Sequence, residues 1–164
     1  MSEIRIERAV AADFLAVAEL DRRAWSANRN SQFIPDGEHV WRIWVEHALV
    51  FVAREDMRVV GAILCMPCIA GPWCLHKVFV DDVARGRGVG SKLFEALLAE
   101  VDRLKGDCFL TVDPVNAGAI ALYTKWGFTE KRFVKGYYRE NEDRFVMTRR
   151  WRGMTDAEIR MTKE

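Results

Sequence analysis

The first part of the chain combines a strand-like pattern with two helical ones. Ile4–Arg8 alternates apolar and polar residues, as a half-buried strand does. Asp13 is expected to cap the helix that follows it. The apolar positions of that helix share one face: Phe14, Val17, Leu20 and Ala24. After a polar loop over Ser26–Gly37, a second helix has apolar residues at helical spacing: Val40, Trp41, Trp44, Val45 and Ala48.

The middle of the chain is predicted to be extended. Strands are expected over Leu49–Ala53, Val59–Met66 and Trp73–Val80. The first two flank a charged turn, Arg54–Arg58, and this arrangement is typical of a β-hairpin.

The second half of the chain holds the clearest helix in the sequence. Its apolar residues form one stripe, made of Leu93, Phe94, Leu97, Leu98, Val101 and Leu104. Gly106 is expected to end it. The elements expected next are a strand over Cys108–Val112, a helix over Asn116–Trp126, and strands over Phe128–Val134 and Arg144–Thr148. These elements predict a single α/β domain over residues 1–150, followed by a charged tail, 151–164, that can form a loosely docked helix.

Composition narrows the function classes. The 164 residues include 25 Lys and Arg against 24 Asp and Glu, and half of the chain is hydrophobic. A net charge of +1 gives no general attraction to nucleic acid or to anionic membranes, so neither is expected as a partner. No apolar run approaches the ~18 residues of a membrane span. The opening residues lack the apolar core of a signal peptide, and a cytoplasmic location is therefore predicted.

The strongest chemical signal is a glycine-rich loop between the strand ending at Val80 and the long helix. Gly86, Gly88 and Gly90 remove side chains where the backbone can approach a ligand, and Arg85 and Arg87 add positive charge. The N–H groups of the helix's first turn point at the same place, with the helix dipole behind them. This arrangement favours an anion, and a pyrophosphate is the obvious candidate.

The loop has three other interpretations. The spacing G-x-G-x-G differs from the G-x-G-x-x-G of dinucleotide-binding folds. The order Gly90-Ser91-Lys92 differs from the Gly-Lys-Ser/Thr ending of a Walker loop. The glycines can also serve packing alone, in a strand-to-helix turn without a ligand.

The order R-x-x-G-x-G, starting at Arg85 and following Val78–Val80, resembles the acyl-CoA pyrophosphate loop of the GNAT superfamily of N-acetyltransferases. Residues 116–128 are similar to that superfamily's N-x-x-A-x-x-L-Y-x-x-x-G-F segment. The resemblance implies a mixed, mostly antiparallel central sheet of about six to seven strands flanked by helices, with two strands splayed to form the acyl-CoA wedge. It also implies acetyl-CoA as donor and a primary amine as acceptor.

The resemblance also implies residue roles. The acetyl-CoA site would consist of Val78, Phe79, Val80, Arg85, Gly86, Arg87, Gly88, Val89, Gly90, Ser91, Asn116 and Tyr123. Asn116 is equally well suited to be a helix N-cap. Tyr123 matches the tyrosine assigned as general acid to the departing thiolate, and its alternative role is a packed aromatic. His76 corresponds to a histidine implicated in proton removal in arylalkylamine N-acetyltransferases, and imidazole suits that task near neutral pH. A wall residue is the alternative for His76.

One departure concerns the base. Residues 109–112, Tyr137–Tyr138 and Glu142–Asp143 are similar to ribosomal-protein alanine N-acetyltransferases, which carry a glutamate base where this chain has Thr111. His76, a water molecule or an already neutral substrate must replace it. An α-amine has a pKa of ~8 and a lysine ~10.4, a difference of ~3 kcal/mol in deprotonation. We therefore expect an α-amine or another amine of low pKa, in a peptide, a protein or a small molecule.

The acceptor pocket is less patterned. Trp25, Trp41 and Trp44 can line it, although helical spacing favours Trp41 and Trp44 as core. The hairpin residues Tyr137, Tyr138, Glu140 and Glu142 can meet a cationic substrate or can simply be exposed.

Rival functions remain at this stage. Cys65 and Cys68 form a C-x-x-C with Cys74 and His76 nearby, but the spacing matches no common zinc pattern and no helix start follows, so no metal is expected. A covalent acetyl-cysteine at Cys74 has only His76 to activate it, so direct attack in a ternary complex is favoured. A non-catalytic acyl-CoA-binding module is the alternative, and a monomer or a homodimer is compatible with the sequence.

Overall fold

Seven strands and four α-helices make up most of residues 2–26 and 35–153, which are the residues that the computed structural model describes. They fall into two units. The first consists of residues up to 68 together with 74–100, and the second of 69–73 together with the chain from 101. No helix in the described part of the chain is long and apolar enough to cross a membrane.

The first unit is built on an antiparallel sheet. Its strands are β1 (Ile4–Arg8), β2 (Leu49–Glu55), β3 (Arg58–Pro67) and β4 (Trp73–Val80), which lie in this order. β2 and β3 form the predicted hairpin, in which Phe51 is opposite Ile63. Its turn contains Asp56 with φ of 51°, a conformation that a short polar side chain tolerates better than most.

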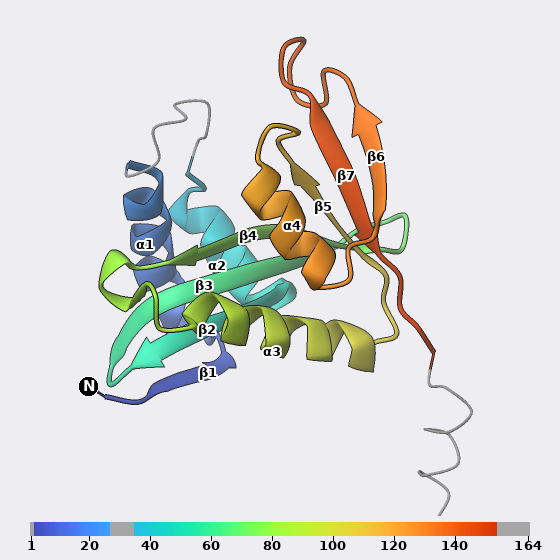
Figure 1. Ribbon diagram of the computed structural model, residues 1–164. Helices are drawn as coiled ribbons and strands as arrows, with labels where there is room; N and C mark the ends of the chain where they lie inside the picture. The colour runs from blue at the N-terminus through green and yellow to red at the C-terminus, as the bar shows by residue number, and fades with distance from the viewer. Residues whose placement is uncertain (1, 27–34, 154–164) are drawn as a thin grey trace, which may run out of the picture. The chain divides into compact units, whose positions relative to one another are not determined.

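Two helices, α1 (Phe14–Ser26) and α2 (Glu38–His47), cover one face of this sheet, as Figure 1 shows. The apolar faces predicted for them form the core with β2 and β3, through residues that include Val17, Leu20, Trp41, Val45, Val50, Val52 and Leu64. Trp41 is fully buried, which confirms its expected place in the core, and Trp44 is partly buried against the same cluster. The predicted loop over Ser26–Gly37 falls largely on residues 27–34, outside the described residues.

Asp13 does not cap α1 as predicted. It closes a short 3-10 turn, Ala11–Asp13, that runs directly into the helix. Its carboxylate reaches back to the N–H of Val10 at 3.0 Å and accepts a hydrogen bond from Arg54 at 2.8 Å. The residue type indicated a helix start, but with the extra turn the carboxylate meets an N–H three residues before it instead of one in the first turn of α1.

Helix α3 (Val89–Arg103) packs on the opposite side of β3 from α1 and α2. Leu93, Phe94, Leu97 and Leu98 are buried, in agreement with the predicted stripe, and Leu104 lies beyond the helix and is exposed. The approach is close at Gly61 of β3. A Cβ there would lie 3.2 Å from Leu93 Cδ1 and 3.2 Å from the Phe79 carbonyl oxygen.

Gly106 follows the end of α3 for a different reason from the expected one. Lys105, not Gly106, adopts the left-handed conformation, with φ of 55°. The Gly106 N–H bonds to the Val101 carbonyl at 3.0 Å. A Cβ on Gly106 would lie 2.5 Å from Trp73 Cδ1, so the glycine is required by the tryptophan ring.

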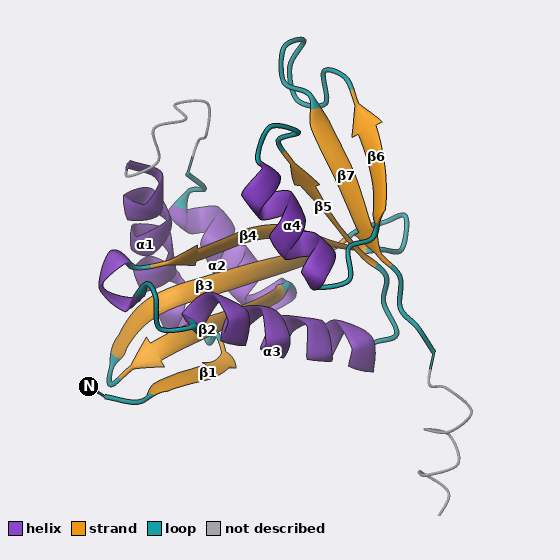
Figure 2. Ribbon diagram, viewed as in Figure 1, coloured by secondary structure: helices purple, strands orange, loops and turns teal. Residues whose placement is uncertain are grey.

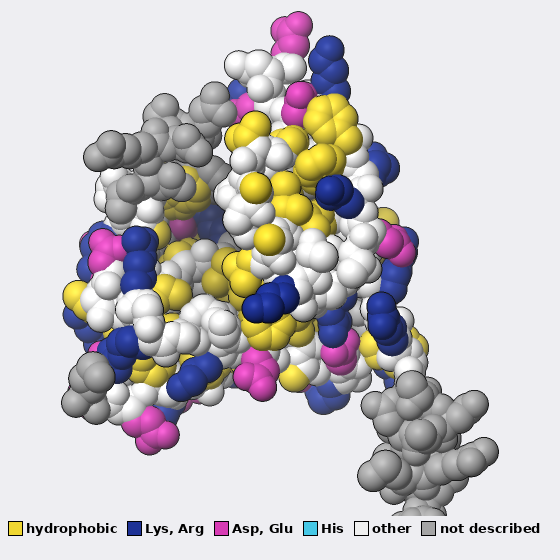
Figure 3. Space-filling model, viewed as in Figure 1, with side chains coloured by type: hydrophobic (Ala, Val, Ile, Leu, Met, Phe, Trp, Pro, Cys, Tyr) yellow, Lys and Arg dark blue, Asp and Glu magenta, His cyan; other side chains and the backbone are white. Residues whose placement is uncertain are grey.

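The second unit contains the antiparallel order β5 (Cys108–Val112), β7 (Arg144–Arg149) and β6 (Glu130–Val134), together with α4 (Ala117–Lys125), as coloured in Figure 2. Arg149 makes two hydrogen bonds of 2.7 Å to the Asp102 carboxylate. Hydrophobic side chains are among those that this unit presents to solvent (Figure 3); they include Leu122, Phe133, Tyr137 and Tyr138.

The observed elements confirm the predicted fold class, a mixed α/β fold with mostly antiparallel strands. The single domain over residues 1–150 and the acyl-CoA wedge between splayed strands stay predictions. Of the predicted tail, Trp151–Gly153 has no helix or strand, Trp151 donates its N–H to Asp107 at 2.7 Å, and residues 154–164 lie outside the described residues.

The contacts at Gly61 generate a stability prediction. Gly61→Ala should lower the free energy of unfolding by about 1–3 kcal/mol, because the Phe79 backbone cannot move away from the added methyl group. Urea titration measures this. Gly118→Ala is the control, since a Cβ there meets only Asn116 Oδ1, at 3.9 Å, and its free energy of unfolding should equal or exceed that of the unchanged chain because Gly118 lies within α4. Equal stability of the two variants would contradict the prediction.

Candidate active site

The glycine loop is held open at the start of α3. After β4, a 3-10 turn over Asp82–Ala84 leads through the loop into the helix. Gly86 and Gly88 have φ of 74° and 73°, which L side chains rarely adopt. A Cβ on either of them, or on Gly90, would meet nothing within 4 Å. The glycines therefore face open space and are not needed for internal packing.

The first turn of α3 supplies hydrogen-bond donors to the same region. The first N–H bonded back into the helix is that of Lys92, which reaches the Gly88 carbonyl at 3.1 Å. The N–H groups of Val89, Gly90 and Ser91 precede it and have no partner within the helix. With no acidic residue in this turn, the positive end of the helix dipole is uncompensated. These donors are what the predicted anion site requires, and the site itself stays a prediction.

The two arginines of the loop differ in their surroundings. Arg87 donates to Glu55 at 2.9 Å and to the Ser2 carbonyl at 3.3 Å. The hydrogen bond from Arg87 is the main reason that the pKa of Glu55 lies below its ordinary value. Arg85 pairs with Asp82 at 2.9 Å, and both side chains are largely exposed. Arg85 can therefore turn to a ligand at little cost, whereas Arg87 ties the loop to the β2–β3 hairpin.

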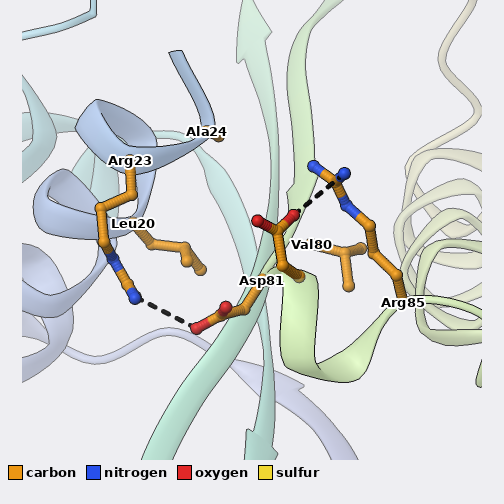
Figure 4. A pocket seen from close by; sticks show the side chains of 7 residues that line it. Leu20, Arg23, Ala24, Val80, Asp81 and Arg85 are labelled. Atoms are coloured by element: carbon orange, nitrogen blue, oxygen red, sulfur yellow. Dashed lines mark hydrogen bonds and ion pairs between the residues drawn. The ribbon is translucent and has the colours of Figure 1, made fainter. Parts of the chain in front are cut away.

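Asp81 fixes the other end of the loop. Its buried carboxylate accepts hydrogen bonds from Arg23 at 3.1 Å and Arg58 at 2.6 Å. A cavity of about 70 Å³ lies beside it (Figure 4), lined by Leu20, Arg23, Ala24, Val80, Asp81, Asp82 and Arg85. Because typical ligand pockets measure several hundred Å³, this space suits only part of a ligand.

β4 alternates between a core face and an open face. Leu75, Lys77 and Phe79 are buried, and the Phe79 ring packs edge-on against Trp41 at 5.9 Å. Phe79 can therefore offer a ligand only its backbone. Cys74, His76, Val78 and Val80 occupy the other positions of the strand and are more exposed.

Four charged or titratable side chains form a cluster at β4, which we call the Asp–Lys–His cluster. His76 and Lys77 belong to the strand, Asp21 to α1, and Asp36 precedes α2. The Lys77 ammonium is buried and contacts Asp21 at 2.8 Å and Asp36 at 2.7 Å. His76 Nε2 lies 3.4 Å from Asp36 Oδ2. The imidazole is about one third exposed, and its ring centroid lies 5.5 Å from that of Trp44.

Asp21 is the deepest member of the cluster and is fully buried. It accepts hydrogen bonds from the indoles of Trp25 at 2.8 Å and Trp41 at 3.0 Å, and from the Asp36 N–H at 3.0 Å. Trp25 thus helps to satisfy a buried carboxylate, and the Lys77 ammonium lies 5.4 Å from the centroid of its ring. Sequence analysis singled out His76 and missed Asp21, Asp36 and Lys77.

Asp36 is ionised at neutral pH. Its partial burial would raise the pKa of the carboxyl group, but the close contacts of His76 and Lys77 outweigh this, and the pKa lies below its ordinary value. The cluster therefore keeps an ionised carboxylate next to the His76 imidazole at neutral pH.

The second unit holds Asn116 and Tyr123. Asn116 caps α4 by accepting the Ala119 N–H at 3.1 Å, which confirms the capping role foreseen for it. Tyr123 packs edge-on against Phe128 at 6.3 Å, and burial raises the pKa of its hydroxyl. The phenol is consequently protonated at neutral pH, as a general acid must be.

Thr111 and the residues before β7 are engaged with one another. The Thr111 hydroxyl shares a hydrogen bond of 2.8 Å with the Tyr138 hydroxyl. Glu142 is buried and accepts from Arg139 at 2.9 Å, so its carboxylate is not presented at a rim to a cationic substrate. Tyr137, Tyr138 and Glu140 remain exposed.

All four cysteines lie within the described residues and are thiols. Among those same residues, no three His, Cys, Asp or Glu side chains are grouped as metal ligands. The Asp–Lys–His cluster and the glycine loop are thus the two features from which a function must be argued.

Comparisons with known proteins point to one family. The family model described as "Acetyltransferase (GNAT) family" matches residues 14–128. An N-alpha-acetyltransferase of Sulfurisphaera tokodaii is 26% identical over 163 residues, covering 88% of this chain and 92% of that protein.

Two solved structures share the fold. The ribosomal-protein-S18-alanine N-acetyltransferase of Escherichia coli has a TM-score of 0.76 at 23% identity, covering 94% of this chain and 97% of that one. A Salmonella typhimurium protein solved with acetyl-CoA has a TM-score of 0.75 at 20% identity, covering 93% and 96%. At these identities the structures show the common fold and leave function to the site.

Proposed function

The chain belongs to the GNAT family of acetyltransferases, and from this premise we propose that it transfers an acetyl group from acetyl-CoA to the α-amine of a peptide or protein. The observation that carries the donor half of the proposal is the open glycine loop at the start of α3. The acceptor half is supported by the limited strength of the base that the site offers.

The loop suits the diphosphate of coenzyme A. Left-handed Gly86 and Gly88 turn the backbone, and the open space at both glycines gives phosphate oxygens room to approach it. The N–H groups of residues 89–91 then donate to those oxygens, with the helix dipole favouring their charge. Arg85 can exchange its exposed partner Asp82 for a phosphate. We assign the pantetheine arm to the backbone of Val78–Val80, and Asn116 to the same coenzyme, on the family resemblance.

The reaction requires two proton transfers. The neutral amine attacks the thioester carbonyl carbon, so that an N–C bond forms and the C–S bond breaks. We assign the amine proton to His76 and the proton on the departing sulfur to Tyr123, whose raised pKa keeps it protonated. A backbone N–H within residues 78–80 polarises the carbonyl oxygen. The amine attacks acetyl-CoA directly in a ternary complex, because the sequence around Cys74 offers only His76 to activate it as a carrier of the acetyl group.

The acceptor follows from the base. Thr111 cannot remove a proton, and its hydroxyl is engaged with Tyr138. Imidazole is a moderate base, which suits an amine with a pKa of ~8 far better than a lysine at ~10.4. The extra deprotonation of lysine costs ~3 kcal/mol. A relative named N-alpha-acetyltransferase agrees with this choice.

Binding of the donor can be tested at Gly88. Gly88→Ala should weaken acetyl-CoA binding at least about 10-fold by calorimetry, since the methyl group strains the left-handed residue and narrows the loop. Gly71→Ala is the matched control, because Gly71 also has a positive φ and open space around it, in the β3–β4 turn. Unchanged binding by Gly88→Ala would contradict the loop assignment.

The acceptor class can be tested by CoA release. A peptide with a free α-amine should react at least about 10-fold faster than the same peptide blocked at its α-amine and carrying a lysine. Polyamines and arylalkylamines complete the panel. A faster lysine peptide would contradict the proposal. Tight acetyl-CoA binding without CoA release for any amine would favour the alternative, a non-catalytic acyl-CoA-binding module.

The acid can be tested by Tyr123→Phe. This change keeps the ring packed on Phe128 and removes the hydroxyl that would donate the proton to the departing sulfur. We therefore expect kcat to fall by about 100-fold while the Kd for acetyl-CoA is unchanged. Stopped-flow measurement of the chemical step and a thermal melt of the variant separate chemistry from stability. Turnover equal to that of the unchanged protein would exclude Tyr123 as the acid.

A further inference from the structure

The Asp–Lys–His cluster carries more buried charge than stability explains. Asp21 is fully buried and Lys77 nearly so, although taking such charges out of water costs several kcal/mol per ion. Well-packed apolar residues commonly replace buried ion pairs without loss of stability. A second carboxylate, Asp36, joins the same ammonium and also faces an exposed imidazole. This layout indicates a role beyond holding the fold together.

The cluster holds Asp36 at two points. Its backbone N–H donates to Asp21 at 3.0 Å, and its carboxylate contacts the Lys77 ammonium at 2.7 Å. Lys77 is itself fixed by both oxygens of Asp21, at 2.9 Å and 2.8 Å. The position of Asp36 is therefore set from the protein interior, and the same oxygen that contacts Lys77, Oδ2, also lies 3.4 Å from His76 Nε2.

The surroundings of the His76 imidazole include one charged group in direct contact, the Asp36 carboxylate. Among the described residues, the Trp44 ring also contacts the imidazole, Lys77 and Asp21 lie behind Asp36, and Cys74 is on the same strand face. An imidazolium formed during the reaction is thus stabilised where it forms.

We infer that Asp36 is a positioning residue that holds the His76 imidazole through Nε2, so that Nδ1 receives the proton of the attacking amine. This inference rests on the proposed function and on the role of His76 in it. The N–H bond of the amine breaks and its proton moves to Nδ1, while the amine nitrogen bonds to the thioester carbon. The sulfur leaves with the electrons of the C–S bond and is protonated by Tyr123.

The first test is Asp36→Asn, with a free α-amine peptide as acceptor. kcat should fall by about 100-fold, because the imidazole loses its fixed orientation, while the Kd for acetyl-CoA stays unchanged. Asp36→Glu should restore part of the rate, because it returns a carboxylate to the site. A merely structural role for Asp36 would instead reduce the number of acetyl-CoA-binding sites and leave kcat per site unchanged.

The second test is a double-mutant cycle with His76→Gln. If Asp36 acts through His76, Asp36→Asn should have almost no further effect on kcat in the His76→Gln background. Multiplying losses would overturn the inference. Glu38→Gln is the matched control, because Glu38 is a nearby carboxylate at the start of α2 that pairs with Arg22 at the surface, and its rate should match that of the unchanged protein.

The outcomes separate this inference from the proposed function. Absence of CoA release by the unchanged protein with every amine overturns both. Turnover by the unchanged protein, with Asp36→Asn equal to it, overturns only the role of Asp36. For each variant, kcat is calculated per acetyl-CoA-binding site, and the number of sites is measured by calorimetry. A partly unfolded preparation is then not mistaken for a slow enzyme.

Discussion

The close approach of α3 to β3 determines where the glycine loop can lie. At Gly61 the helix comes within van der Waals contact of the strand backbone, and a side chain there would push Leu93 and Val89 outward. Val89 is also the first residue of the helix, so this contact fixes the N–H groups that follow it. Asp81 and Arg87 hold the loop from either side, through Arg23 and Glu55. Fixed donors lose little entropy on binding an anion, which is the purpose of such preorganisation.

Much of the fold could be predicted from periodicity, and the errors have local physical causes. The apolar stripes of α1, α2 and α3 and the β2–β3 hairpin follow directly from residue spacing. Asp13 was assigned as a cap because carboxylates commonly cap helices, but a 3-10 turn ahead of α1 changed which N–H it meets. Gly106 was expected to end α3, and the helix does end before it, but Lys105 adopts the left-handed conformation and the demand on Gly106 comes from the Trp73 ring. Both differences depend on contacts that spacing does not encode.

The candidate site was predictable to a similar degree. The loop glycines could be recognised from the sequence, because closely spaced glycines between a strand and a helix indicate a backbone that can approach a ligand. Asp36 could not, since it lies in the polar stretch between the two predicted helices and its importance depends on its approach to His76 and Lys77. A signal for its partners was nevertheless present: Asp21 interrupts the apolar face of α1, and Lys77 lies between Leu75 and Phe79 on the core face of β4. A charge within an apolar stripe requires a buried partner, and two such charges of opposite sign indicate a pair.

The absence of a carboxylate base at Thr111 and the presence of an Asp36–His76 pair are best considered together. A carboxylate in water is a far weaker base than imidazole and needs a desolvated site to remove an ammonium proton. Imidazole needs orientation and a nearby negative charge, which is the role inferred for Asp36. With such a base a lysine remains hard to deprotonate, because its pKa lies too far above neutral pH for positioning to overcome. The proposed base thus favours amines that are already partly neutral, independently of the shape of the acceptor pocket.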